Sequence, residues 1–363
     1  MAEYPVSRCQ KIRNLVKKEG WAGMLVTDPR NVRWLTGFTG GESYLLVLPQ
    51  REILLSDFRY ALQIERECPP LEYAIRSGSI GLAGLAKAIL EQENTDPQVP
   101  LGMEGEHVTL TMAEVFQQNL ERELVPTRGV VEKYREIKDK EEITSIRKAA
   151  QIAQNAFRAV VAMLTPEKTE KQIADELENA MRQLGAEKAS FPSIVAVGAN
   201  AALCHAVPGQ TRVEEADFLL IDWGAQYRGY ASDLTRVIVT GRKTVRFQKI
   251  FQVVREAQQK AIEAIRPGVP CDEIDRIARD FIAQSGYGKY FDHGLGHGLG
   301  LNIHEAPSFS PRCNTILRPG MVLTVEPGVY IKGWGGIRIE DDVLVTSRGC
   351  EVLTDLEKDW KIW

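Results

Sequence analysis

Four acidic residues interrupt segments that otherwise have the continuous apolar character of buried β-strands. Asp222 and Asp233 lie in FLLIDWGAQYRGYASDLTRVIVT, Glu326 in MVLTVEPGVYI and Glu340 in GIRIEDDVLVT. Burying a carboxylate is costly unless a positive group neutralises it. The fold must therefore supply positive charge to these acids. Divalent metal is the simplest source when several acids gather with a histidine.

Each acid also has an ordinary structural explanation when it is taken alone. Asp222 can cap a turn, and Asp233 can form a surface salt bridge. Glu326 can reach solvent from a strand end. Arg338 and Glu340 alternate onto one face of a strand, so these two can form a structural ion pair.

The histidines support the metal interpretation, because four of the five are His205, His293, His297 and His304. The last three fall within the segment DHGLGHGLGLNIHEAP. His293 and His297 have the spacing of a helical zinc site, but the interspersed glycines disfavour a helix. We therefore expect an extended or looped segment. A regular strand would point His297 and His304 to opposite faces, and the glycines permit a bend that brings both to one cavity.

Composition narrows the class of protein. The 363 residues, 44% hydrophobic and 26% charged, are typical of a soluble globular protein of about two domains. A net charge of −4 predicts no nucleic-acid partner, and no apolar run is long enough to span a membrane. The start of the chain has no apolar core after its charges, so we expect no secretory signal. Six scattered cysteines without a CxxC motif predict free thiols in the reducing cytoplasm.

Hydrophobic periodicity predicts two structural units. Up to about residue 130, strand-like and helix-like segments alternate, which predicts a mixed sheet with covering helices. The strands expected there are AGMLVTD, SYLLVLP, REILLSD and the start of PLGMEGEHVTL, and the helices are SIGLAGLAKAILEQEN and TMAEVFQQNLERE. Beyond it, helices are expected over 138–164, from a capping box at Thr169–Gln172 to Gly185, over 245–265 and over 272–284, with strands in the remainder.

These motifs resemble the M24 pita-bread metallopeptidase family of methionine aminopeptidase, aminopeptidase P, prolidase and creatinase. The contexts DWG…SDLTR, GHGLG, TVEPG and RIEDD match the catalytic domain, and DPRNVRWLTGFTG and LLSDFRY match a creatinase-type amino-terminal domain. The resemblance implies an α/β (α+β) fold. A creatinase-type α/β domain over 1–131 would precede a pita-bread catalytic domain over 132–363, in which helices cover a curved, largely antiparallel sheet.

The resemblance also implies roles for the site residues. The metal ligands it implies are Asp222, Asp233, His297, Glu326 and Glu340. The catalytic residues it implies are Glu326, His304 and His205, and the substrate-binding residues are His293, Arg338 and Tyr330. Four carboxylates balance two divalent cations, with one neutral histidine completing the set. Oxygen-rich ligation with a single imidazole favours Mn²⁺, with Co²⁺ or Zn²⁺ as alternatives.

The activity implied is hydrolysis of the Xaa-Pro bond at the amino terminus of short peptides by an aminopeptidase P-like, metal-dependent enzyme. The alternative is the dipeptidase prolidase, and a further alternative is a non-catalytic peptide-binding module. The complete ligand set argues against creatinase, and His293 with Arg338 argues against methionine aminopeptidase. Family analogy adds a homodimer, for which Trp34 and Phe38 are either interface residues or ordinary core residues.

Overall fold

The computed structural model describes residues 6–78 and 80–361. The chain separates into two compact units, and the division falls between Arg135 and Glu136. The predicted boundary between residues 131 and 132 falls inside helix α6 (Val130–Arg135), close to this division. Two predictions fall partly outside the described residues. The expectation of no secretory signal concerns a segment that starts with residues 1–5, and one predicted helix starts at Ser79.

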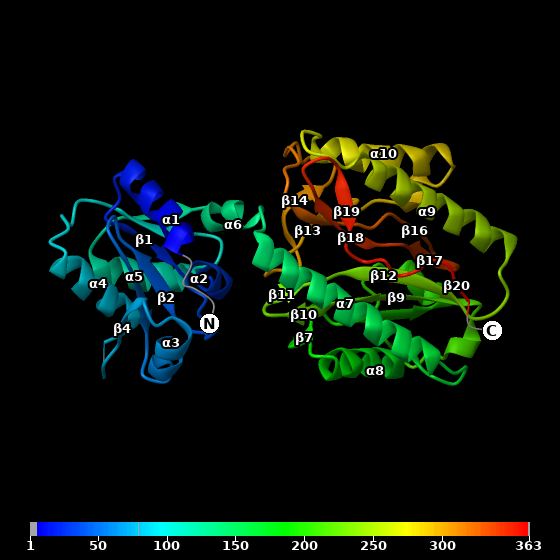
Figure 1. The fold of residues 1–363 in the computed structure, drawn as a ribbon, viewed down its shortest axis with the longest axis horizontal. Helices are drawn as coiled ribbons and strands as arrows, with labels where there is room; N and C mark the ends of the chain where they lie inside the picture. Colours follow the sequence, from blue (N-terminus) through cyan, green and yellow to red (C-terminus); the bar gives the residue numbers. More distant parts are fainter. Residues whose placement is uncertain (1–5, 79, 362–363) are drawn as a thin grey trace. The chain divides into compact units, whose positions relative to one another are not determined.

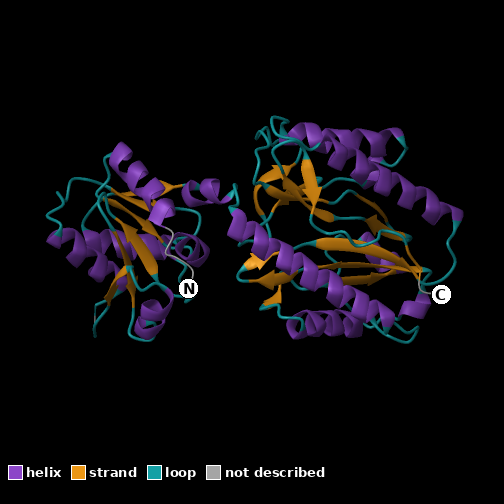
Figure 2. Cartoon of the chain, viewed as in Figure 1, coloured by secondary structure: helices purple, strands orange, loops and turns teal. Residues whose placement is uncertain are grey.

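The first unit is a mixed six-stranded sheet, in the order β4-β3-β2-β1-β5-β6, with helices packed against it (Figures 1 and 2). Antiparallel pairing joins β1, β2 and β3, and parallel pairing adds the other three strands. The strands are β1 (Gly23–Val26), β2 (Tyr44–Val47), β3 (Glu52–Ser56), β4 (Glu72–Ile75), β5 (Leu101–Glu104) and β6 (Leu124–Thr127). The helices are α1 (Val6–Glu19), α2 (Pro29–Thr36), α3 (Ala61–Glu67), α4 (Leu82–Gln92), α5 (Leu110–Leu120) and α6.

Helix α2 and the residues just after it carry Trp34 and Phe38, the two aromatic residues considered for an interface. Asp28 caps the helix by accepting a hydrogen bond from the Arg30 amide, and Pro29 occupies the first turn. Trp34 and Phe38 are 3% and 0% exposed. Both side chains are therefore core residues of this unit, and the idea that they provide an exposed interface is not supported.

The second unit places strands between two pairs of helices, with α7 and α8 on one side and α9 and α10 on the other (Figure 1). The helices are α7 (Lys140–Ala162), α8 (Glu170–Gln183), α9 (Val245–Ala264) and α10 (Cys271–Gln284), with 3₁₀ turns at Gly198–Ala202, Val213–Glu215 and Gly288–Tyr290. The strands are β7 (Lys188–Ala189), β8 (Ile194–Val197), β9 (Phe218–Trp223), β10 (Ala225–Tyr227), β11 (Tyr230–Ala231), β12 (Leu234–Val239), β13 (Gly296–Gly298), β14 (Glu305–Phe309), β15 (Val322–Val325), β16 (Gly328–Ile331), β17 (Gly335–Arg338), β18 (Asp341–Val345), β19 (Cys350–Val352) and β20 (Trp360–Lys361).

The strands of this unit form four sheets, in the orders β11-β10-β7, β20-β12-β9-β8, β14-β13-β15-β18-β19 and β16-β17. Among the described strands of the second unit, only the pairing of β12 with β20 is parallel. The largely antiparallel arrangement covered by helices confirms the predicted fold class.

The central strands are apolar along their whole length because both faces are covered. Leu219 and Ile221 of β9 pack in the cluster that includes α7 and α8, whereas Phe218 and Leu220 pack in the cluster that includes α9 and α10. A strand buried on both faces has no polar alternation. An acid such as Asp222 in β9 is therefore unusual and needs a specific partner.

Local signals in the sequence explain the helix ends. Asp139 with Glu142, and Thr169 with Gln172, form capping boxes at the starts of α7 and α8. The second box confirms the one predicted. The connection between β9 and β12 forms a small hairpin of its own, β10 with β11. Asp233 consequently lies just before β12 rather than within it.

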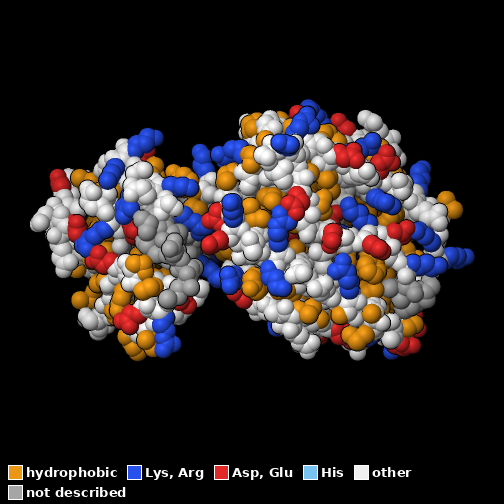
Figure 3. Space-filling model, viewed as in Figure 1, with side chains coloured by type: hydrophobic (Ala, Val, Ile, Leu, Met, Phe, Trp, Pro, Cys, Tyr) orange, Lys and Arg blue, Asp and Glu red, His pale blue; other side chains and the backbone are white. Residues whose placement is uncertain are grey.

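The described surface shows little segregation of charge. Acidic and basic side chains are interspersed on the faces of both units drawn in Figure 3. Among the described helices, none has the length and apolar character needed to cross a membrane. All six cysteines are free thiols.

Candidate metal centre and active site

Two of the acids that interrupt the buried strands line a cavity of about 300 Å³ in the second unit. Asp222 and Asp233 lie in its wall, together with two of the singled-out histidines, His205 and His304. The apolar and small residues that also line it are Phe191, Pro192, Ser193, Ile194, Ala206, Val207, Pro208 and Ile303. The cavity therefore combines an acidic wall with a mainly apolar one.

Different sheets supply the acidic side chains. Pairing of β9 with β12 sets Asp222 opposite Thr235, two residues after Asp233. A single bridge between Thr235 and Glu340 then joins β12 to the segment between β17 and β18. This bridge brings Glu340 to the two aspartates, although more than 100 residues separate them in the chain.

His297, in β13, completes the cluster. One ligand atom each from Asp233, His297 and Glu340 lie within 4.8 Å of one another. The Nε2 atom of His297 is 3.4 Å from Glu326 Oε1 and 3.7 Å from Asp233 Oδ2. Glu326 is held between β15 and β16, where its carboxylate accepts a hydrogen bond from Thr324.

The acids of this cluster have too little positive charge nearby. Asp222 Oδ1 and Asp233 Oδ1 are buried without a hydrogen-bond partner among the described residues. Burial, reinforced by neighbouring acids, raises the pKa of Asp233 and Glu340 well above the usual range. Burial also raises the pKa of Glu326 to about 8, although Arg338 opposes the shift. Divalent cations would remove this penalty, so the residues present fit a metal site.

Two histidines next to the acids, His297 and His304, have lowered pKa values, which favours their neutral form. Burial lowers the pKa of His297 to about 4 and also lowers the pKa of His304. Their rings meet edge to face, with centroids 4.4 Å apart. Because β13 ends at Gly298 and the chain turns back into β14, the two histidines reach one cavity despite their odd spacing. The predicted bend is confirmed.

A chain of hydrogen bonds leads from Asp222 to His293. The guanidinium of Arg338 is 2.5 Å from Asp222 Oδ2 and donates to the Tyr330 hydroxyl at 2.8 Å. His293 lies 3.0 Å from that hydroxyl through Nε2 and 2.7 Å from the Gly294 carbonyl through Nδ1. Since a carbonyl only accepts, Nδ1 carries the proton and Nε2 accepts from tyrosine. Burial lowers the pKa of His293 to about 4, which agrees with this neutral tautomer.

The structure thus places four predicted site residues in the cavity wall and connects the other six to them through the contacts described above, while the role of each remains a prediction. Three polar contacts around the acids were not anticipated. Thr235 donates to Glu340 Oε2 at 2.6 Å, the Thr324 hydroxyl accepts from the His297 amide at 3.1 Å, and Asp342 accepts from the Asp233 amide at 3.0 Å. The contact of Thr235 with the site could have been predicted from the sequence, because Thr235 lies two residues after Asp233 and alternate residues of an extended segment share a face.

Comparison with known proteins identifies the family. The chain matches the model of metallopeptidase family M24 over residues 144–347 and that of the creatinase/prolidase N-terminal domain over residues 8–137. It is 37% identical to the Xaa-Pro dipeptidase of Pyrococcus furiosus, covering 97% of this chain and 99% of the relative.

Two solved structures are similar along nearly the whole chain. The Xaa-Pro dipeptidase from Bacillus anthracis gives a TM-score of 0.94 at 37% identity, covering 99% of each chain. The X-Pro aminopeptidase from Thermotoga maritima MSB8 gives a TM-score of 0.88 at 34% identity, covering 94% of this chain and 98% of that one. Together with the buried acidic cluster, these matches show that the chain belongs to metallopeptidase family M24, in its Xaa-Pro peptidase branch, and is a metal-dependent peptidase.

Proposed function

We propose that this protein hydrolyses the Xaa-Pro bond of short peptides that carry proline at the second position. The observation that carries the proposal is the cluster of Asp222, Asp233, His297, Glu326 and Glu340 around a cavity large enough for a small peptide. Relatives named as Xaa-Pro dipeptidases and an X-Pro aminopeptidase, each at least 34% identical, support the same bond specificity.

The five clustered residues are proposed to hold two divalent cations. When bound, such ions supply a Lewis acid for the scissile carbonyl and lower the pKa of water to near 7. The ligand set is mostly oxygen, which favours Mn²⁺ over softer ions. The four carboxylates match the charge of two divalent ions, so the filled site is close to neutral.

The side chains around the cluster account for proton transfer and charge stabilisation. Glu326, whose carboxylate lies 3.4 Å from His297 Nε2 within the cluster, is proposed to take a proton from water and deliver it to the departing proline nitrogen. His304 and His205 face the same cavity and would donate hydrogen bonds to the oxygen of the tetrahedral intermediate. His293, Tyr330 and Arg338 are proposed to orient the substrate around the scissile bond, with Arg338 holding Asp222 in place.

Dipeptides are favoured over longer peptides as substrates. Sequence motifs alone led to an aminopeptidase P-like enzyme with prolidase as the alternative, and the relatives support the alternative better. The Pyrococcus furiosus relative and the Bacillus anthracis structure are both named as Xaa-Pro dipeptidases. Aminopeptidase activity remains the second candidate because of the similarity to the Thermotoga maritima X-Pro aminopeptidase. We further propose a cytoplasmic homodimer, the cytoplasm being suggested by the six free thiols.

The deciding experiment compares an Xaa-Pro dipeptide with the matching Xaa-Pro-Xaa tripeptide. Purified protein is stripped with EDTA, reloaded with Mn²⁺ and assayed for release of Xaa from each. The proposal expects cleavage of the dipeptide with the higher kcat/KM and no cleavage in EDTA. Faster cleavage of the tripeptide would favour the aminopeptidase. Cleavage of neither peptide, with Mn²⁺ bound, would overturn the proposed activity.

A further inference from the structure

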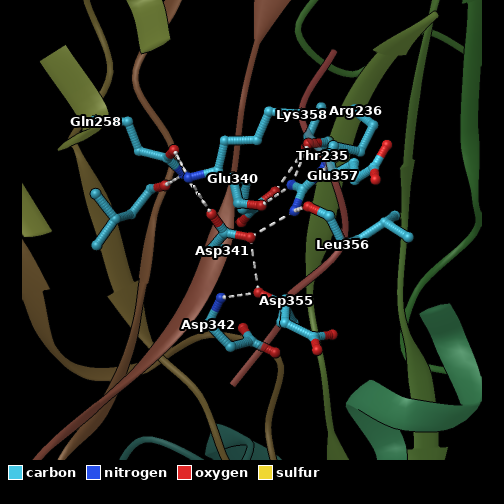
Figure 4. A network of polar contacts seen from close by, with 12 residues as sticks. Thr235, Arg236, Gln258, Glu340, Asp341, Asp342, Asp355, Leu356, Glu357 and Lys358 are labelled. Carbon is cyan, nitrogen blue, oxygen red and sulfur yellow. Dashed lines mark hydrogen bonds and ion pairs between the residues drawn. The ribbon is translucent and has the colours of Figure 1, made fainter. Parts of the chain in front are cut away.

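The residue after Glu340 is another buried acid, Asp341, and its carboxylate is surrounded by hydrogen-bond donors and cations rather than by other acids (Figure 4). Asp341 is 0% exposed and contacts two cations, Arg236 at 2.6 Å and Lys358 at 2.9 Å. Gln258 and Thr354 donate to the remaining positions of its carboxylate, at 3.0 and 2.9 Å. The proposed reaction requires none of these residues to touch substrate.

The partners of Asp341 also hold the backbone next to the proposed ligands. The Arg236 guanidinium donates to the carbonyl of Thr235 at 2.9 Å and to the carbonyl of Glu340. Gln258 donates to the carbonyl of Val325 at 3.0 Å, one residue before Glu326. The network around one carboxylate therefore fixes the main chain beside Asp233, Glu326 and Glu340, which come from three separate strand ends.

The carboxy-terminal segment 354–361 closes this network. Arg236 donates to the carbonyls of Leu356 at 2.8 Å and Glu357 at 3.0 Å, so the segment is tied down along its backbone. Lys358 reaches inward to both Asp341 and Gln258 Oε1, the latter at 2.7 Å. Beyond it, β20 pairs with β12, the strand that follows Asp233.

We propose that Asp341, Arg236 and Lys358 are positioning residues of the metal site, with segment 354–361 acting as a strap that sets the spacing of the ligand-bearing strand ends. The inference rests on the proposed metal site and names a part of the chain that it requires. The Arg236 guanidinium donates to Asp341 through one nitrogen and to backbone carbonyls through the others, and the Lys358 ammonium adds a second cation, so these contacts hold the buried carboxylate and the neighbouring main chain in fixed positions. Groups that hold metal ligands in place typically change metal affinity by about 10–100-fold when they are removed.

The test measures metal binding separately from stability. EDTA-stripped wild-type protein, Lys358→Met, Lys358→Arg and Asp341→Asn are titrated calorimetrically with Mn²⁺, and the unfolding temperature of each is measured in EDTA. Lys243→Met is the matched control, because Lys243 pairs with Asp359 on the same segment at 3.0 Å but makes no described contact with Asp341. Lys358 is 27% exposed in its side chain, so its removal leaves the core packing in place.

The expected result is a Mn²⁺ dissociation constant raised about 10–100-fold in Lys358→Met and Asp341→Asn. Lys358→Arg, which keeps the cation, and Lys243→Met should bind like wild type. A variant that unfolds at a lower temperature in EDTA yet binds Mn²⁺ with wild-type affinity would show a merely structural role and overturn the inference. If Asp341→Asn does not fold, Lys358→Met against Lys358→Arg decides. Wild-type protein that binds no Mn²⁺ would instead overturn the proposed function on which the inference rests.

Discussion

Glu340 and Asp341 are consecutive acids, 1% and 0% exposed, in opposite electrostatic situations. Asp341 has Arg236 and Lys358 against its carboxylate and two neutral donors besides. Glu340 accepts a hydrogen bond from the Thr235 hydroxyl and lies near Glu326 and Asp222. Burial, together with these two acids, raises the pKa of Glu340 well above the usual range. One carboxylate is neutralised by its own chain and the other is not.

The difference between Glu340 and Asp341 shows which buried acid needs a neutralising group that the protein does not supply. Burial alone does not mark a functional acid, because a paired acid such as Asp341 is equally buried. An acid that is buried among other acids is stable only when a proton or a cation neutralises it. The boundary between the two situations runs between residues 340 and 341, and substitutions on either side of it should behave differently.

Removing an unneutralised acid should have the largest effect. Asp233→Ala should lower turnover of an Xaa-Pro peptide by more than the about 100-fold expected for residues that only hold ligands, because it removes a metal-binding oxygen. Steady-state assays with saturating Mn²⁺ check this. Glu340→Ala should behave in the same way, and an Asp233→Ala protein that retains full activity in EDTA would contradict the assignment.

His304→Ala tests a residue of the cavity that is not expected to bind metal. Loss of its hydrogen bond to the developing negative charge should lower kcat by about 10²–10³-fold. The affinity for Mn²⁺ should fall far less than in Asp233→Ala, because His304 contacts the ring of His297 but is not expected to bind the metal itself. Weakened Mn²⁺ binding together with unchanged kcat would reverse the proposed roles of His297 and His304.

Tyr330→Phe tests the chain between Arg338 and His293. The phenyl ring keeps the packing but lacks the hydroxyl. That hydroxyl accepts a hydrogen bond from Arg338 at 2.8 Å and donates one to His293 at 3.0 Å. Losing a hydrogen bond of this kind costs about 1 kcal/mol, or roughly 5-fold in kcat/KM. Kinetics on dipeptides should show this loss with unchanged Mn²⁺ affinity, and an unaltered kcat/KM would exclude the chain from substrate handling.

The smallest effect expected is a pH dependence of the metal-free protein. The folded-state pKa of Glu326, about 8, is above its usual value of 4.5, and those of Asp233 and Glu340 are raised too. The unfolded chain therefore releases these protons at lower pH, and folding stability must fall as pH rises towards 8. The window from pH 7 to 8 reports mainly on the acids, since histidines are mostly neutral in the unfolded chain above pH 7.

Thermal unfolding in EDTA should accordingly show a lower midpoint at pH 8 than at pH 7, and Mn²⁺ should reverse the loss. Each kcal/mol lost corresponds to about 2–4 °C for a unit of this size. Asp341→Asn serves as the comparison, because its carboxylate is paired in the wild type and its loss should leave this slope in place. A midpoint that rises from pH 7 to 8 in EDTA would contradict the proposed burial of unpaired acids.

The site was more accessible from sequence than its supporting structure. Glycines around His297 and apolar runs around Asp222 and Glu326 are local signals, and they led correctly to a looped histidine segment and buried strands. Helices α2 and α3 were missed because they are short, with eight and seven residues, whereas helical periodicity is recognised over windows of about 11–18 residues. Capping at Asp28 and Pro29 was the available signal for α2.

The contacts that assemble the site could not be read from the sequence. The bridge between Thr235 and Glu340 and the ion pair of Arg236 with Asp341 join residues about 105 positions apart. No periodicity encodes such a pairing, because it depends on how separate sheets meet. The family resemblance singled out Glu340 and left Asp341 without a role, which only the partners of Asp341 in the fold reveal.

The most direct test of the central claim is calorimetric titration of EDTA-stripped protein with Mn²⁺ at pH 7.5, comparing wild type with Glu340→Gln. The account predicts that wild-type protein binds two Mn²⁺ ions per chain with release of protons, since acids with raised pKa values must ionise. It predicts that Glu340→Gln loses binding. Absence of Mn²⁺ binding by the wild type, or undiminished binding by Glu340→Gln, would contradict it.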